Sequence, residues 1–104
     1  MTTEAEVSAG SCGFVTGIRV ERRENCVEVR ITTACEKVAK FAEAVGRLQL
    51  RDALSEMCAS PVYRAATQAR LHPGCPVPAA VLRAVEIEAG AATPRSVVID
   101  FKKR

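Results

Sequence analysis

Apolar and polar residues alternate along the first third of the chain, and this pattern predicts a β-hairpin. In residues 13–22 and again in residues 26–33, apolar side chains fall on one face of an extended strand and charged side chains on the other. The polar segment 23–25 separates the two runs, which is typical of a hairpin turn. Residues 4–9 predict a further short edge strand.

The spacing of apolar residues changes to three and four positions after residue 35, which predicts helices. The clearest stripe extends over residues 36–48 and contains Val38, Phe41, Ala42, Val45 and Leu48. The same spacing predicts further helices near residues 50–57, 61–70 and 78–89. Four helices are therefore expected after the hairpin.

Residue types at the ends of these segments support their boundaries. Ser60 followed by Pro61 predicts an N-cap and a first helical position, and Gly90 predicts a C-terminal stop. Alternating residues in 96–102 then predict a final strand. We expect its apolar residues to face the core: Val97, Ile99 and Phe101.

The order of these elements predicts an α+β fold, in which a small antiparallel or mixed sheet carries about four helices on one face. We expect the sheet to consist of the N-terminal hairpin and the C-terminal strand. A chain of 104 residues can build one hydrophobic core, so we predict a single domain spanning residues 1–104. Because aromatic residues make up only 4% of the chain, this core must consist largely of aliphatic side chains.

The net charge of +3 is mild and gives little support for a nucleic-acid partner. Nucleic-acid-binding domains usually carry a denser basic stripe, with aromatic residues on which bases stack. The N-terminus lacks the features of a signal peptide, and no stretch reaches the roughly 18 apolar residues of a membrane span. We therefore predict a cytoplasmic protein that binds neither nucleic acid nor a membrane.

The five cysteines are the strongest chemical signal in the sequence. Cys35 and Cys75 precede predicted helices, and Cys58 lies shortly before the helix expected at 61–70. Cys12 lies in a segment with a glycine on its C-terminal side, whereas Cys26 is typical of an ordinary strand residue. A thiol at a helix N-terminus meets free N–H groups and the positive end of the helix dipole, which favour the thiolate. The thiolate is both the nucleophile and the metal ligand in cysteine chemistry.

The hairpin geometry predicts that Cys12 and Cys35 lie close together. With the turn centred near residue 24, position 12 falls opposite position 35 or 36, at the roughly 5 Å separation of paired residues on neighbouring strands. An odd number of cysteines in a reducing compartment argues against a structural disulfide framework. Metal binding, catalysis and simple burial therefore remain as explanations for these thiols.

Cys75 is expected at the same end of the molecule. If the strand at 96–102 pairs antiparallel with residues 13–22, the helix that precedes it begins near residue 13. Cys58 or His72 is then the candidate for a fourth ligand.

Each of these residues also has a simpler interpretation. A free cysteine frequently behaves as a small buried hydrophobe, which is the favoured interpretation for Cys26 and an equal alternative for Cys58. His72 is more simply a loop residue with a local hydrogen bond, and Arg64 a solvated helix residue. Glu86 and Glu88 point to different sides of a helix, so they are poor candidates for a shared acid–base site.

Two short motifs are fairly specific: Cys12-Gly13-Phe14 near the start, and Cys75-Pro76-Val77-Pro78 before the last predicted helix. Together with Cys35 and the segments 60–63 and 84–90, they resemble a family of small uncharacterised prokaryotic proteins of about this length. The resemblance covers nearly the whole chain. It implies no activity and no cofactor, but it places Cys12, Cys35 and Cys75 at positions that match the family pattern.

The first hypothesis for function is a cysteine-ligated metalloprotein. Cys12, Cys35 and Cys75 would bind an iron–sulfur cluster such as a 4Fe–4S cluster, or zinc, with Cys58, His72 or an external group as a further ligand. Because the sequence contains no C-x-x-C pair, we expect the cluster slightly more than zinc, since structural zinc is usually bound by pairs of ligands close together in the sequence. The role would be electron transfer, cluster carriage or sensing, with a protein partner or an electron donor or acceptor.

Two alternatives remain open. In the first, Cys75 is a reactive thiol, with Cys12 or Cys35 as resolving partner and His72 as the available base. In the second, the cysteines are core residues of a metal-free interaction module, which could form a homodimer through a helical face. That face would contain Leu50, Met57 and Tyr63.

Overall fold

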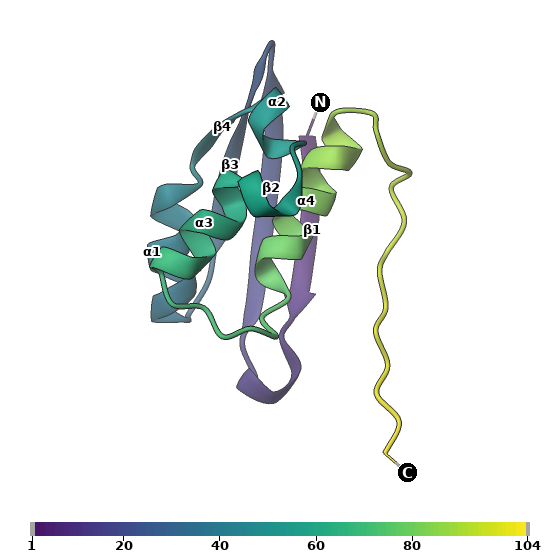
Figure 1. Ribbon diagram of the computed structural model, residues 1–104. Coiled ribbons are helices and arrows are strands. Elements are labelled where there is room, and N and C mark those ends of the chain that lie inside the picture. The colour runs from purple at the N-terminus through teal and green to yellow at the C-terminus, as the bar shows by residue number, and fades with distance from the viewer. Residues whose placement is uncertain (1, 104) are drawn as a thin grey trace.

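The computed structural model describes residues 2–103 and shows an α+β fold, in which helices cover one face of a four-stranded antiparallel sheet (Figure 1). The strands lie in sequence order, β1-β2-β3-β4. In chain order the elements are β1 (Thr2–Ser8), the 3-10 turn η1 (Gly10–Cys12), β2 (Val15–Arg23), β3 (Cys26–Thr32), α1 (Glu36–Ala44), β4 (Arg47–Gln49), α2 (Leu50–Ala53), the 3-10 turn η2 (Met57–Ala59), α3 (Pro61–Gln68) and α4 (Val77–Glu88).

The predicted hairpin is confirmed as β2 and β3, which pair from Gly17 with Thr32 to Arg23 with Cys26. The turn therefore contains Glu24 and the residue after it, and Glu24 adopts a left-handed conformation with φ of 52°. This register differs from the predicted one. The strand pairing ends before Cys12, which lies in η1 and not opposite a β3 residue.

The edge strand expected at 4–9 is present as β1, and it corrects the prediction for the C-terminus. All seven residues of β1 pair with β2, from Thr2 with Glu21 to Ser8 with Val15. Because β3 occupies the other edge of β2, no edge of β2 is free for residues 96–102. That segment forms no strand in the structure and runs beside the body of the molecule (Figure 1). Its residue Phe101, expected in the core, is 92% exposed.

The helix predicted over 36–48 ends at Ala44, because the following residues join the sheet. The carbonyl oxygen of Gly46 accepts a hydrogen bond of 2.9 Å from the Val29 amide, and β4 pairs with β3. Leu48 still lies in the core, but it reaches it from a strand. Backbone pairing with a sheet edge here overrides the helical spacing of the side chains.

The predicted helix boundaries near the caps are confirmed. The Ser60 hydroxyl accepts hydrogen bonds from the amides of Val62 and Tyr63, at 3.2 and 3.4 Å, which satisfies two of the free N–H groups at the start of α3. Gly90 follows α4 with φ of 79°, the left-handed conformation that ends many helices.

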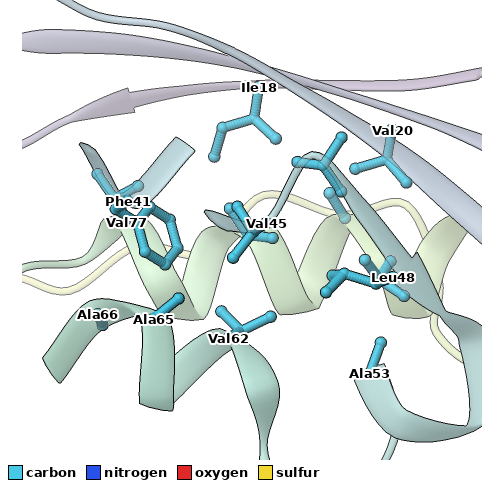
Figure 2. Close-up of a cluster of buried hydrophobic side chains, with 14 of the residues drawn as sticks. Ile18, Val20, Phe41, Val45, Leu48, Ala53, Val62, Ala65, Ala66 and Val77 are labelled. Atoms are coloured by element: carbon cyan, nitrogen blue, oxygen red, sulfur yellow. The ribbon is translucent and has the colours of Figure 1, made fainter. Parts of the chain in front are cut away.

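The core lies between the sheet and the helices and is largely aliphatic, as the composition predicts (Figure 2). Phe41 projects from α1 into this layer and is fully buried, whereas Phe14 is 38% exposed. The other residues labelled in the close-up are Ile18, Val20, Val45, Leu48, Ala53, Val62, Ala65, Ala66 and Val77.

A buried carboxylate fixes the direction of α4 across the sheet. Glu88 is only 4% exposed; one of its oxygens accepts a 2.7 Å hydrogen bond from the Thr3 hydroxyl and the other a 3.2 Å bond from the Arg22 amide. Both donors lie toward the hairpin-turn end of β1 and β2. The C-terminal end of α4 is therefore held at that end, and its N-terminal end lies at the opposite end of the sheet.

The longest helix described, α4, has 12 residues. Among residues 2–103, no helix combines the length and apolar character needed to cross a membrane.

Candidate functional site

A small pocket lies at the open end of the hairpin, opposite the end where Glu88 is held. Three of the predicted cysteines and the single histidine line it: Cys12, Cys35, His72 and Cys75. Its cavity volume is about 40 Å³, which is more than the roughly 10–15 Å³ that one water molecule needs. The remaining lining residues are Ala9, Phe14, Thr16, Lys37, Val38 and Leu71.

Cys12 reaches the pocket from the tight loop between β1 and β2. The Ala9 amide donates to the Phe14 carbonyl oxygen at 3.1 Å and closes the loop, and the Gly13 amide donates to the Gly10 carbonyl oxygen at 2.9 Å. Gly10 and Gly13 both adopt positive φ, 72° and 73°, where a side chain would strain the backbone. The two glycines therefore allow the turn that presents the exposed Cys12 thiol.

Cys35 is held at the start of α1 by a pair of threonines. It is the N-cap residue of the helix, and its side chain makes no capping hydrogen bond, so the sulfur remains available to the pocket. Its amide donates to the Thr33 hydroxyl at 3.1 Å, and that hydroxyl lies 3.2 Å from the hydroxyl of the buried Thr16. This connection ties the helix start to β2.

His72 and Cys75 belong to one turn between α3 and α4. The Cys75 amide donates to the His72 carbonyl oxygen at 3.0 Å, which fixes the two residues relative to each other. The turn follows Arg70, which adopts a left-handed conformation with φ of 59° and ends α3. Cys75 then lies two residues before Val77, the first residue of α4.

One direct contact joins the loops. The Cys12 sulfur lies 3.6 Å from Nε2 of His72, a residue 60 positions away in the sequence. Either group can donate in this contact, depending on which imidazole nitrogen carries the proton. The side chain expected to be a simple loop residue is thus in contact with one of the predicted ligands.

The other two cysteines lie outside the pocket. Cys58 is exposed in η2 and does not line it. Cys26 is buried beside the hairpin turn, where its sulfur donates to the Arg23 carbonyl oxygen at 3.3 Å. Arg64, also considered above, donates to the Ala59 carbonyl oxygen at 3.1 Å on the helical side.

The convergence of Cys75 with Cys12 and Cys35 arises by a different route from the one expected. The predicted route needed residues 96–102 as a strand beside β2, and that strand is absent. The route in the structure is the docking of α4 across β1 and β2 through Glu88.

The four side chains are near one another but do not form a closed ligand set. Within residues 2–103, no three or more His, Cys, Asp or Glu side chains lie close enough together to hold a metal ion. A metal site here therefore requires the Cys12 loop and the His72–Cys75 turn to approach the start of α1.

The residues that position the thiols were hard to predict from the sequence. Thr16 faces the core between apolar neighbours, and a polar residue on an inward-facing strand position is the one available signal of its bond to Thr33. Lys37 adds a positive charge to the pocket lining, and nothing in the apolar pattern of α1 distinguishes it from other surface lysines.

A sequence-family model described as "Family of unknown function (DUF6951)" matches residues 3–101. The match includes all five cysteines, the whole of the pocket and most of the extended C-terminal segment. No curated protein and no solved structure matches the chain significantly.

Proposed function

The chain belongs to DUF6951, a family of unknown function, and we propose that its pocket binds a single metal ion through three thiolates and one imidazole. The ligands are Cys12, Cys35, His72 and Cys75. All four line one pocket, although they come from three separate segments of the chain.

The observation that carries this proposal is the distance between Cys12 and His72. Zinc binds thiolate sulfur at about 2.3 Å and imidazole nitrogen at about 2.05 Å in tetrahedral sites, which puts the two ligand atoms about 3.6 Å apart. The Cys12 sulfur and His72 Nε2 are separated by 3.6 Å. The first two ligands therefore already have the separation that a tetrahedral ion requires.

The set of donor atoms also favours a particular class of metal. Three sulfur atoms and one nitrogen suit zinc and other thiophilic ions, whereas magnesium and calcium prefer oxygen ligands. The pocket lining contains no carboxylate. Lys37 in the lining would offset part of the negative charge that three thiolates bring to the site.

The position of Cys58 favours one ion over the iron–sulfur cluster expected from the cysteine pattern. The cavity volume of about 40 Å³ exceeds the roughly 10–15 Å³ that one water molecule needs, so the pocket has room for one ion. Cys58, the fourth thiol in that expectation, lies outside the pocket.

The proposal is tested by metal analysis of protein purified without oxygen. We expect one zinc ion per chain, no acid-labile sulfide, and loss of the ion in Cys12→Ser and Cys75→Ser. Cys58→Ser is the matched control, since Cys58 is also exposed but lies outside the pocket, and it should retain the ion. Iron with labile sulfide would support the cluster instead. A folded protein that contains neither iron nor labile sulfide and takes up no added Zn²⁺ or Co²⁺ would contradict both forms of metal binding.

The same contact between Cys12 and His72 favours a second candidate, a reactive thiol without metal. His72 would accept the proton of Cys12, and the thiolate would then attack an electrophile. This differs from the sequence hypothesis, in which Cys75 is the nucleophile, because among residues 2–103 the His72 ring forms a hydrogen-bond contact with the thiol of Cys12 and not with that of Cys75.

Alkylation kinetics in metal-free protein test this second candidate. The Cys12 sulfur would form a bond to the carbon of iodoacetamide, iodide would leave, and His72 would hold the thiol proton. Cys12 should then react several times faster than Cys58, which is also exposed, and His72→Ala should remove the difference. Equal rates at the two cysteines would rule the candidate out.

A further inference from the structure

The C-terminal segment 95–103, here called the tail, is extended and lies beside the body of the molecule (Figure 1). Val97, Ile99 and Phe101 alternate along one side and are 61%, 68% and 92% exposed, and Val98 on the other side is 76% exposed. Residues of this kind are typical of strands and are rarely left exposed in a row. In the described part of the chain, the tail pairs with no strand.

The outer edge of β1 is a suitable partner for such a segment. β1 lies at one end of the strand order, so its inner edge pairs with β2 and its outer edge pairs with no strand among residues 2–103. An edge strand exposes a row of N–H and C=O groups that can accept another strand. β1 has seven residues, and the alternating part of the tail, residues 96–102, has the same length.

We propose that the tail of one molecule pairs with the outer edge of β1 in a second molecule, and that the exchange is reciprocal. Each sheet then gains a strand, and the apolar side of the tail covers the helix side of the sheet next to the partly buried Ala5 and the buried Val7. The result is a homodimer held by exchanged strands, a form of strand addition.

Charge complementarity selects β1 over the other edge of the sheet. β1 carries two exposed carboxylates, Glu4 and Glu6, and no basic residue. The tail carries Arg95, Lys102 and Lys103 against the single acidic residue Asp100, so it is basic overall. The opposite edge strand, β4, is only three residues long and carries Arg47, which would repel the tail.

Strand direction favours a second molecule over the tail's own β1. Figure 1 shows that β1 and the tail of the same chain run in the same direction, so their pairing would be parallel. A two-fold axis perpendicular to the sheet reverses the partner's tail and makes the pairing antiparallel, as in every other pair of this sheet. Antiparallel pairing is slightly more stable per residue.

The exchange is tested by measuring the mass of the full chain in solution by light scattering and sedimentation. We expect a dimer, and we expect a monomer for the chain ending at Arg95. Because the tail contributes nothing to the core, the shortened chain should remain folded. Phe101→Asp should raise the dimer dissociation constant by about a hundredfold, since it prevents burial of the largest apolar side chain of the tail.

A charge exchange identifies β1 as the docking edge. The double variant Glu4→Lys, Glu6→Lys should be monomeric, and adding Lys102→Glu and Lys103→Glu to the same chain should restore the dimer. A monomeric full-length protein would overturn the proposal, and so would a dimer that survives removal of the tail. The latter result would direct attention to the helical side, where Leu54 and Met57 are 43% and 68% exposed.

Discussion

The two ends of the sheet differ in how their polar groups are used. At the hairpin-turn end, both oxygens of the buried Glu88 accept hydrogen bonds, and α4 is held against β1 and β2. At the open end, three thiols and an imidazole line a small pocket, and the Cys12 sulfur lies 3.6 Å from Nε2 of His72. The carboxylate at the first end holds the fold together, whereas the sulfur and nitrogen atoms at the second end remain available as ligands.

This difference shows how a stabilising contact can serve a distant site. Glu88 is the last residue of α4, and Cys75 lies two residues before the first residue of this helix. Because Glu88 fixes the position of α4, it also fixes where Cys75 meets the pocket. The comparison predicts that changes at the hairpin-turn end reduce stability, and that changes at the open end alter chemistry with smaller effects on stability.

The largest effect is expected from Glu88→Ala. The substitution removes two hydrogen bonds to a charged group and leaves the Arg22 amide and Thr3 hydroxyl without their partner, so we expect a loss of about 3 kcal/mol in the free energy of unfolding. Urea denaturation measures it. Glu86→Ala is the control on the same helix, because Glu86 is half-exposed and has only a 3.8 Å ion pair with Arg83; it should change stability by less than about 0.5 kcal/mol. Equal losses would contradict the assigned role of Glu88.

A smaller effect is expected from Gly13→Ala in the pocket loop. Its positive φ of 73° strains any residue with a Cβ, so we expect a loss of about 1 kcal/mol and weaker metal binding as Cys12 is displaced. Gly74→Ala is the control in the other loop, since its added Cβ would make an ordinary contact of 3.8 Å with the His72 ring. Thermal melts and zinc titrations of both variants measure these effects. A loss in Gly13→Ala alone would indicate backbone strain, whereas equal losses would indicate that any substitution in these loops is harmful.

Cys35→Ser is expected to separate chemistry from stability. The thiol is half-buried and makes no capping hydrogen bond, so its replacement by a hydroxyl should cost less than about 1 kcal/mol in the metal-free protein. Zinc affinity should nevertheless fall sharply, because one thiolate ligand is lost. If the metal-free variant unfolds, Cys35 at the open end is needed for stability, which would contradict this prediction.

The smallest effect is expected from Arg70→Gly, and it should be stabilising. Arg70 occupies a left-handed position at the end of α3, where Gly is favoured, so removal of the side chain relieves strain. Part of the gain is offset by the greater freedom of glycine in the unfolded chain, which leaves about 0.5 kcal/mol. A rise in the melting temperature without a change in metal binding would support this, and a fall would contradict it.

Local sequence patterns predicted the secondary structure correctly where the tertiary contacts of a segment favour the same conformation as its own residues. The alternation in β2 and β3 predicted the hairpin, and Ser60 with Pro61 predicted the start of α3. Cys12, Cys35 and Cys75 all line the pocket, but no three His, Cys, Asp or Glu side chains among residues 2–103 are close enough to hold a metal ion. The strand pairing from which their approach was predicted was wrong.

Sheet edges were the main source of error. Val97, Ile99 and Phe101 alternate as well as the residues of β2 do, but alternation does not state which edge is free, and β1 had already taken the place beside β2. In the same way, Leu48 continues the helical spacing of α1, but residues 47–49 pair with the free edge of β3 and form a strand. Pairing between strands depends on segments distant in the sequence, so no local spacing can predict it.

The sequence by itself determined whether most segments are extended or helical, with residues 47–49 and 96–102 among the exceptions. It also determined where α3 begins and α4 ends, and which residues have thiol or imidazole chemistry. Only the tertiary structure decided that His72 belongs with the three cysteines and that Cys58 does not. The physical reason is that propensity, spacing and capping act within about one turn of a helix or one strand pair. The pocket, in contrast, is formed where three loops meet, and a buried carboxylate at the other end of the sheet fixes the helix that brings them together.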